Sequence, residues 1–141
     1  MIIINAPHWF VLPVTMQQVV SWLLLVISII LVAWGVVLLR STGKAAAPSD
    51  KSPMFEWENT EKLVTTGIFR YIRHPMYSSL LFLAWGALLK SITLGTLILT
   101  GVATLALVAT ARAEEAENLA RFGMEYRNYM RRTRLFVPFL L

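Results

Sequence analysis

The feature that most constrains this chain is a run of about 21 residues without a charge, at positions 19–39, which Arg40 closes. As an α-helix rising 1.5 Å per residue, the run would span about 30 Å, the thickness of a bilayer's hydrocarbon core. Only 15% of the 141 residues are charged and 57% are hydrophobic, whereas soluble domains carry roughly 25% charged residues. The chain is therefore predicted to be an integral membrane protein.

Two further apolar runs follow at 71–89 and 92–111, and Lys90-Ser91 between them suits a tight turn. Pro75 fits the first turn of a helix, where its missing N–H costs nothing. We predict a single domain, 1–141, with an all-α integral membrane fold: about three transmembrane helices plus a cytoplasmic C-terminal helix. The remaining segments are an N-terminal interfacial segment (1–18), a cytoplasmic loop (40–70), and a cytoplasmic helix and tail (112–141).

The basic residues lie almost entirely on one side of these predicted spans. Lys90 is the one basic residue between the second and third spans. By the positive-inside rule the N-terminus is outside and the C-terminus is cytoplasmic, as in a bacterial-type inner membrane. Topology thus accounts for the net charge of +5, and no nucleic-acid partner is predicted. The cytoplasmic basic residues are Arg40, Lys44, Lys51, Lys62, Arg70 and Arg73 before the second span, and Arg112, Arg121, Arg127, Arg131, Arg132 and Arg134 after the third.

The composition also limits the chemistry. The chain has no cysteine, so it has no disulfide, thiolate metal site or cysteine nucleophile. Its two histidines, His8 and His74, fall on opposite sides of the predicted membrane, so no metal site is expected.

Two stripes recur at helical spacing. The first is a row of threonines every four residues in the third span, and such small polar residues favour close helix packing. The second is an apolar stripe on the helix that leaves the membrane. The stripes consist of Thr96, Thr100 and Thr104, and of Leu119, Phe122, Tyr126 and Tyr129.

Polar groups gather at the cytoplasmic ends of the second and third spans. His74 and Tyr77 are three residues apart and share a helical face. They read either as an interfacial belt that anchors headgroups or as ligand contacts, since such groups are costly at a membrane segment. Glu114 and Glu115 read either as a solvated helix end or as acceptors for an ammonium group, and Arg112 suits a carboxylate. Together they suggest one polar pocket for a zwitterionic ligand.

The two stretches together resemble a known family, the membrane methyltransferases that include isoprenylcysteine carboxyl methyltransferase and the phospholipid N-methyltransferases. The similarity runs from about Glu61 to the C-terminus. Its first part is similar to that family's cofactor motif, and its second part to the C-terminal signature. The matching residues are the continuous stretch 63–77 and then Arg112, Ala113, Glu114, Glu115, Leu119, Phe122, Gly123, Tyr126, Tyr129, Pro138 and Phe139.

The resemblance implies an enzyme that uses S-adenosylmethionine at the cytoplasmic membrane face. Glu115 would hold the cofactor's ammonium group, or Glu114 would, because the spacing to Phe122-Gly123 is one residue shorter than in the isoprenylcysteine enzymes. Arg112 would meet the substrate head group as the catalytic residue. The implied substrate is lipid-like or prenylated. Three spans are fewer than isoprenylcysteine enzymes have, so a homodimer would complete the cavity among the membrane lipids. The other implied cofactor contacts are Glu61, Lys62, Leu63, Val64, Phe69, His74, Pro75, Met76 and Tyr77.

The acceptor chemistry stays open at this point. A carboxylate acceptor needs no general base, whereas an amine must lose a proton, for which His74 or a glutamate is the candidate. Two other functions compete with the methyltransferase. One is an NADPH-dependent reductase of the sterol-reductase type, which uses a similar His-Pro-x-Tyr stretch. The other is a small membrane protein without catalytic activity.

Overall fold

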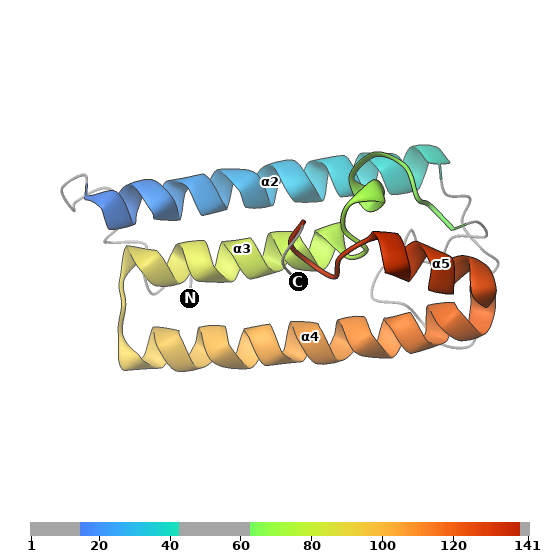
Figure 1. The fold of residues 1–141 in the computed structure, drawn as a ribbon. Coiled ribbons are helices and arrows are strands. Elements are labelled where there is room, and N and C mark those ends of the chain that lie inside the picture. Colours follow the sequence, from blue (N-terminus) through green and yellow to red (C-terminus); the bar gives the residue numbers. More distant parts are fainter. Residues whose placement is uncertain (1–14, 43–62, 139–141) are drawn as a thin grey trace.

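The computed structural model describes residues 15–42 and 63–138. Within these ranges the chain forms four α-helices and one short 3-10 turn. Helices α2, α3 and α4 lie side by side with α3 in the middle, and α5 turns back beside the end of α4 (Figure 1). The all-α prediction is confirmed. The elements are α2 (Met16–Thr42), η3 (Gly67–Arg70), α3 (Pro75–Lys90), α4 (Leu94–Phe122) and α5 (Met124–Arg132).

Two of the helices are long and apolar enough to cross a membrane. These are the stretch Met16–Ser41 of α2, with a mean hydropathy of 2.9, and α4, with 2.0. Large apolar side chains cover their outer surfaces, with Ile29 65% and Leu105 71% exposed. Lipid tails solvate such surfaces without the cost that water imposes. Helix α3 has 16 residues and a length of about 24 Å at 1.5 Å per residue, so the second predicted span, 71–89, is the short one.

All three predicted spans begin or end at other residues than the observed helices do. The run 19–39 extends to Met16–Thr42. The run 71–89 yields a helix only from Pro75, because residues 72–74 pair with the C-terminal segment instead. The run 92–111 continues without interruption to Phe122. The stretch after 111 is rich in Ala, Glu, Arg and Leu, which favour helix regardless of polarity, so α4 ends only at Gly123.

Small residues let α2 and α3 approach closely. The Ser21 hydroxyl donates to the Gly86 carbonyl at 2.7 Å, and the Ser28 hydroxyl donates to the Ser79 carbonyl at 2.7 Å. A Cβ on Gly86 would lie 3.1 Å from the side chain of Leu25. Packing of small residues with hydrogen bonds between helices is how helices associate in lipid, where the hydrophobic effect is absent.

The threonine stripe of α4 packs inward as predicted. Thr96 is 2% and Thr100 is 1% exposed, and the Thr100 hydroxyl donates to the Thr96 carbonyl at 2.8 Å. The Trp85 indole of α3 donates to the Thr104 hydroxyl at 3.3 Å. The stripe thus faces α3 and holds the hairpin α3–α4 together.

Gly67 is the first residue of η3, and its backbone has a φ of +59°. A Cβ at this position would clash with Leu38 Cδ1 of α2. Gly67→Ala is expected to destabilise the protein by about 1–2 kcal/mol from the left-handed backbone alone, and the clash with Leu38 adds to this. Thermal unfolding in neutral micelles checks it. Gly101→Ala is the control, because a Cβ there meets nothing within 4 Å; equal effects of the two changes would contradict the account.

Candidate functional site

The C-terminal segment folds back onto the residues that lead into α3. Ile72 and Arg134 form an isolated parallel bridge. The Arg73 N–H donates to the Arg134 carbonyl at 2.8 Å, and the His74 N–H donates to the Leu135 carbonyl at 3.2 Å. The Ser78 hydroxyl continues the contact by donating to the Phe136 carbonyl at 2.7 Å. Two segments about sixty residues apart thereby form one end of the bundle.

Arg73 connects three parts of this end. Its Nε donates to Glu115 Oε1 of α4 at 2.5 Å, with the two side chains 10% and 4% exposed. Its Nη1 donates to the Thr133 carbonyl at 2.6 Å and the Met130 carbonyl at 3.2 Å. These carbonyls belong to the end of α5, where helices leave acceptors without intrahelical partners. Arg73 therefore ties α4 and α5 to the start of α3, and Glu115 is its buried counter-ion.

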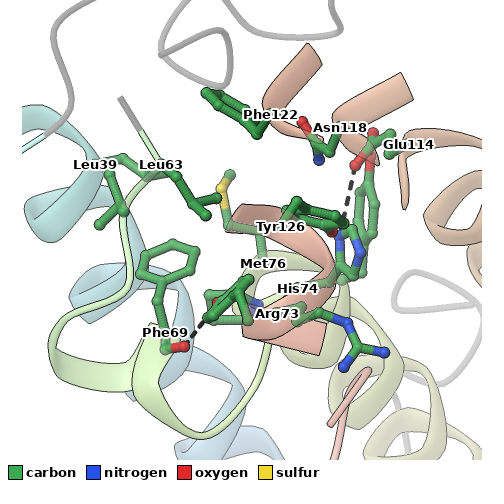
Figure 2. Close-up of a pocket in the computed structure, with 14 residues that line it drawn as sticks. Leu39, Leu63, Phe69, Arg73, His74, Met76, Glu114, Asn118, Phe122 and Tyr126 are labelled. Atoms are coloured by element: carbon green, nitrogen blue, oxygen red, sulfur yellow. Dashed lines mark hydrogen bonds and ion pairs between the residues drawn. The ribbon is translucent and has the colours of Figure 1, made fainter. Parts of the chain in front are cut away.

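An open cavity lies between these elements, with a volume of about 690 Å³ that includes its mouth to solvent. In Figure 2, Glu114, Asn118 and Phe122 lie on one side of the cavity, and Leu39 and Leu63 lie on another. Met76 and Tyr126 lie between these two groups. The lining residues are Leu39, Leu63, Val64, Phe69, Arg73, His74, Pro75, Met76, Tyr77, Glu114, Asn118, Phe122, Tyr126 and Tyr129.

Glu114 is the carboxylate that lines the cavity. The Tyr77 hydroxyl donates to Glu114 Oε1, and His74 Nδ1 lies 3.5 Å from Glu114 Oε2. The Glu114 side chain is 36% exposed, so its carboxylate remains accessible. Asn118 and Phe122 follow at intervals of four on the same helix, which places the three in one row. This row supplies one charged, one amide and one aromatic contact.

His74 carries a polar atom without a partner. Its Nε2 is buried and forms no hydrogen bond within the described structure, and its ring stacks on Tyr77 with centroids 5.5 Å apart and planes at 12°. Buried polar atoms are nearly always hydrogen-bonded, and an exception calls for an explanation. A ligand in the cavity that His74 lines would provide one.

Helix α5 closes the cavity with two tyrosines. The Tyr129 hydroxyl donates to the Phe69 carbonyl at 2.7 Å, and the rings of Tyr126 and Tyr129 contact each other. Burial raises the pKa of Tyr129, and the charge repulsion of an ionised Tyr126 adds to it. Burial likewise raises the pKa of Tyr126. Both hydroxyls therefore stay neutral beyond the pH at which free tyrosine ionises.

The raised pKa values predict a loss of stability at high pH. Because the unfolded tyrosines ionise near pH 10 and the folded ones above it, the unfolded state binds fewer protons there. Stability from these groups is then full below about pH 10 and falls as the pH rises further. Unfolding measured from pH 8 upward checks this, with the double variant Tyr126→Phe/Tyr129→Phe as comparison. A wild-type slope no steeper than that of the variant would contradict it.

The structure brings together most of the residues that the sequence singles out. Glu115 is turned into the bundle and does not line the cavity. Arg112 is 68% exposed, with Nη1 3.9 Å from Glu115 Oε2, and also lies outside the lining. Glu61 and Lys62 fall outside the described residues. The predicted contacts that do line the cavity are Leu63, Val64, Phe69, His74, Pro75, Met76, Tyr77 and Glu114.

Six lining residues are absent from the predicted set. Asn118 could have been predicted from the sequence, because it lies four residues from both Glu114 and Phe122 and therefore shares their helical face. Leu39 carries no such signal, since it looks like any other apolar residue of α2. The six are Leu39, Arg73, Asn118, Phe122, Tyr126 and Tyr129.

Comparison with known proteins gives a consistent result. The family model for phospholipid methyltransferases matches residues 16–125. The chain is 28% identical over 79 residues to the methanethiol S-methyltransferase of Crocosphaera subtropica, 30% over 71 residues to methanethiol S-methyltransferase 1 of Bradyrhizobium diazoefficiens, and 29% over 73 residues to the methanethiol S-methyltransferase of Pseudomonas deceptionensis.

These alignments cover 56%, 50% and 52% of this chain but 30%, 24% and 27% of the relatives, so the chain spans about a quarter to a third of their length. No solved structure gives a significant match. The family match runs from α2 through the row on α4 into α5, and includes the stretch 63–77 and the second stretch as far as Gly123. The protein therefore belongs to the phospholipid methyltransferase family.

Proposed function

We propose that the protein is an S-adenosylmethionine-dependent methyltransferase that works at the cytoplasmic face of a membrane. Methyltransferases of its family use this cofactor, and the family together with the long apolar helices supports an integral membrane protein. We further propose that α2, α3 and α4 all span the bilayer, with the N-terminus outside and the C-terminus in the cytoplasm. The basic residues that gather at the cavity end of the bundle support this orientation.

The observation that carries the proposal is the set of groups in the cavity. Glu114 offers a carboxylate for the cofactor's ammonium group, and Asn118 offers an amide for its polar groups. Phe69, Phe122 and Tyr126 offer ring faces that suit an adenine or a sulfonium cation. The buried Nε2 of His74 lacks a partner. These residues fit S-adenosylmethionine, which when bound supplies an electrophilic methyl group on sulfur.

The remaining chemistry is done by positioning and proton removal. Holding the acceptor beside the methyl group converts a bimolecular step into an effectively unimolecular one, which can lower the activation barrier by roughly 7–11 kcal/mol. A carboxylate acceptor requires nothing more, whereas a thiol or amine must lose a proton. If Nδ1 of His74 carries a proton toward Glu114, Nε2 is left as an acceptor, and we propose it as the base in that case. Arg112 remains proposed as the contact to the acceptor's head group from outside the cavity.

For the acceptor we propose a lipid-like or prenylated molecule that reaches the cavity from the bilayer. The apolar lining from α2 and from the segment before η3, with Leu39, Leu63 and Val64, supports an apolar acceptor. The second candidate is a small thiol, because the curated relatives are methanethiol S-methyltransferases. A homodimer that completes the acceptor cavity stays a prediction. Family membership favours methyl transfer over the reductase and over a non-catalytic role.

The test supplies S-adenosylmethionine with a labelled methyl group to the purified protein in liposomes made from a membrane lipid extract. We expect label in the lipid fraction from the wild type and little from Glu114→Gln. The matched control Glu117→Gln, which changes an exposed carboxylate on the same helix, should label normally. If label appears only in a volatile product after methanethiol is added, the acceptor is a small thiol and not a lipid. No transfer to lipid or thiol by folded protein would overturn the proposal.

A further inference from the structure

A second concavity is lined by residues next to and within the paired segments 72–74 and 134–136. Its volume is about 450 Å³, open solvent included, and it shares no lining residue with the larger cavity. Three of its five lining residues are arginines. It is lined by Tyr71, Arg131, Arg132, Arg134 and Pro138.

These guanidinium groups have no carboxylate partners in the described structure. The ion pairs there involve Arg73, His74 and Arg112 on the basic side, and neither Arg131 nor Arg134 takes part in one. Like charges that share one groove repel each other at short range. The groove is therefore electrostatically complementary to an anion.

Capping of α5 does not account for the cluster. Basic residues in the last turn of a helix interact favourably with its carbonyls, and Arg131 and Arg132 lie in that turn. However, Arg73 already donates to the carbonyls of Met130 and Thr133. Arg134 lies beyond the helix altogether. Interaction with the carbonyls at the end of α5 therefore does not explain why three arginines line one groove.

The backbone holds part of the groove in a fixed place. The Arg134 N–H donates to the Tyr71 carbonyl at 2.9 Å, and the Arg134 carbonyl accepts from the Arg73 N–H at 2.8 Å. Tyr71 is 49% exposed, so its phenol presents a polar tip beside the arginines. A planar guanidinium presents paired donors that match the oxygens of a phosphate.

The position of the groove indicates where the anion comes from. Tyr71 precedes Pro75, the first residue of α3, so the groove lies at the end of the apolar bundle, where lipid headgroups begin. Basic pockets beside membrane helices on the cytoplasmic side are suited to anionic headgroups. We propose that this arginine groove binds a phosphate monoester or diester, either on an anionic lipid or as a soluble anion, apart from the cofactor cavity.

Native mass spectrometry of the purified protein in neutral micelles tests the proposal. Phosphatidylglycerol and phosphatidylcholine are offered in turn, and retained lipid is counted. We expect the wild type to retain phosphatidylglycerol, and Arg131→Gln/Arg134→Gln to bind it roughly 10- to 100-fold more weakly, as the loss of charge-assisted contacts implies. The charge-matched control Arg70→Gln/Arg127→Gln, whose positions lie outside the groove, should bind like the wild type.

Inorganic phosphate then distinguishes the two sources. Displacement of the lipid by millimolar phosphate supports a site for soluble phosphate, and failure to displace it supports a headgroup site. Circular dichroism confirms that the variants are folded. Equal loss in both double variants, or no preference of the wild type for phosphatidylglycerol, would overturn the proposal. The experiment uses no S-adenosylmethionine, so its outcome is independent of the proposed methyl transfer.

Discussion

Replacing Glu114 by glutamine is expected to weaken the binding of S-adenosylmethionine roughly 10- to 100-fold, because a hydrogen bond to a charged group contributes about 1.5–3 kcal/mol. Glutamine keeps the size of the side chain but removes the negative charge that we propose for the ammonium group. It also alters the contact that Tyr77 donates. The effect should be on affinity first, since the fold at this end depends on Glu115 rather than on Glu114.

Calorimetric titration of the purified protein in micelles measures this directly. Glu117→Gln is the matched control, because Glu117 is an exposed carboxylate on the same helix and does not line the cavity. Its affinity should equal that of the wild type. If Glu114→Gln bound the cofactor as tightly as Glu117→Gln does, the assignment of Glu114 would be wrong.

Replacing Arg73 by alanine is expected to destabilise the protein by about 3–5 kcal/mol, the range for breaking one side of a buried ion pair. Glu115, which is 4% exposed, would keep its charge without its main counter-ion. The carbonyls of Met130 and Thr133 would lose their donor as well. Helix α5 would lose its contacts to this side chain, whereas the backbone bonds from residues 73 and 74 to Arg134 and Leu135 would remain.

Thermal unfolding in neutral micelles checks this second prediction. Arg70→Ala, which removes an exposed arginine three residues earlier, serves as the control and should cost little. Adding Glu115→Gln to Arg73→Ala should recover part of the loss, because the double change removes the unpaired charge; contacting residues couple by about 0.5–3 kcal/mol. Additive effects of the two changes would show that the pair contributes nothing.

Helix spacing and charge distribution predicted much of the architecture from the sequence. The uncharged run 19–39, the turn at Lys90-Ser91 and the threonine row all correspond to features of the structure. The sequence predicts a helix beyond residue 111 but not where that helix ends, because hydropathy marks where a helix leaves lipid and not where it ends. The break instead falls at Gly123, whose φ of +55° a glycine adopts readily.

The sequence predicted eight of the fourteen residues that line the cavity, but not which of the two adjacent glutamates faces it. Glu114 and Glu115 are adjacent, and on a helix neighbours point about 100° apart, so only one can face the cavity. The sequence does not show which of the two glutamates faces the cavity, because this depends on the partner that each carboxylate contacts. Arg73 settles it by reaching Glu115, a contact across 42 residues that no local pattern reveals. The fold-back of 133–136 onto 72–74 is equally non-local.

The most direct test of the central claim is a paired titration of the purified wild-type protein with S-adenosylmethionine and with NADPH. The account predicts saturable, one-to-one binding of S-adenosylmethionine, lost in Glu114→Gln, and no comparable binding of NADPH. Tight binding of NADPH without binding of S-adenosylmethionine would contradict it.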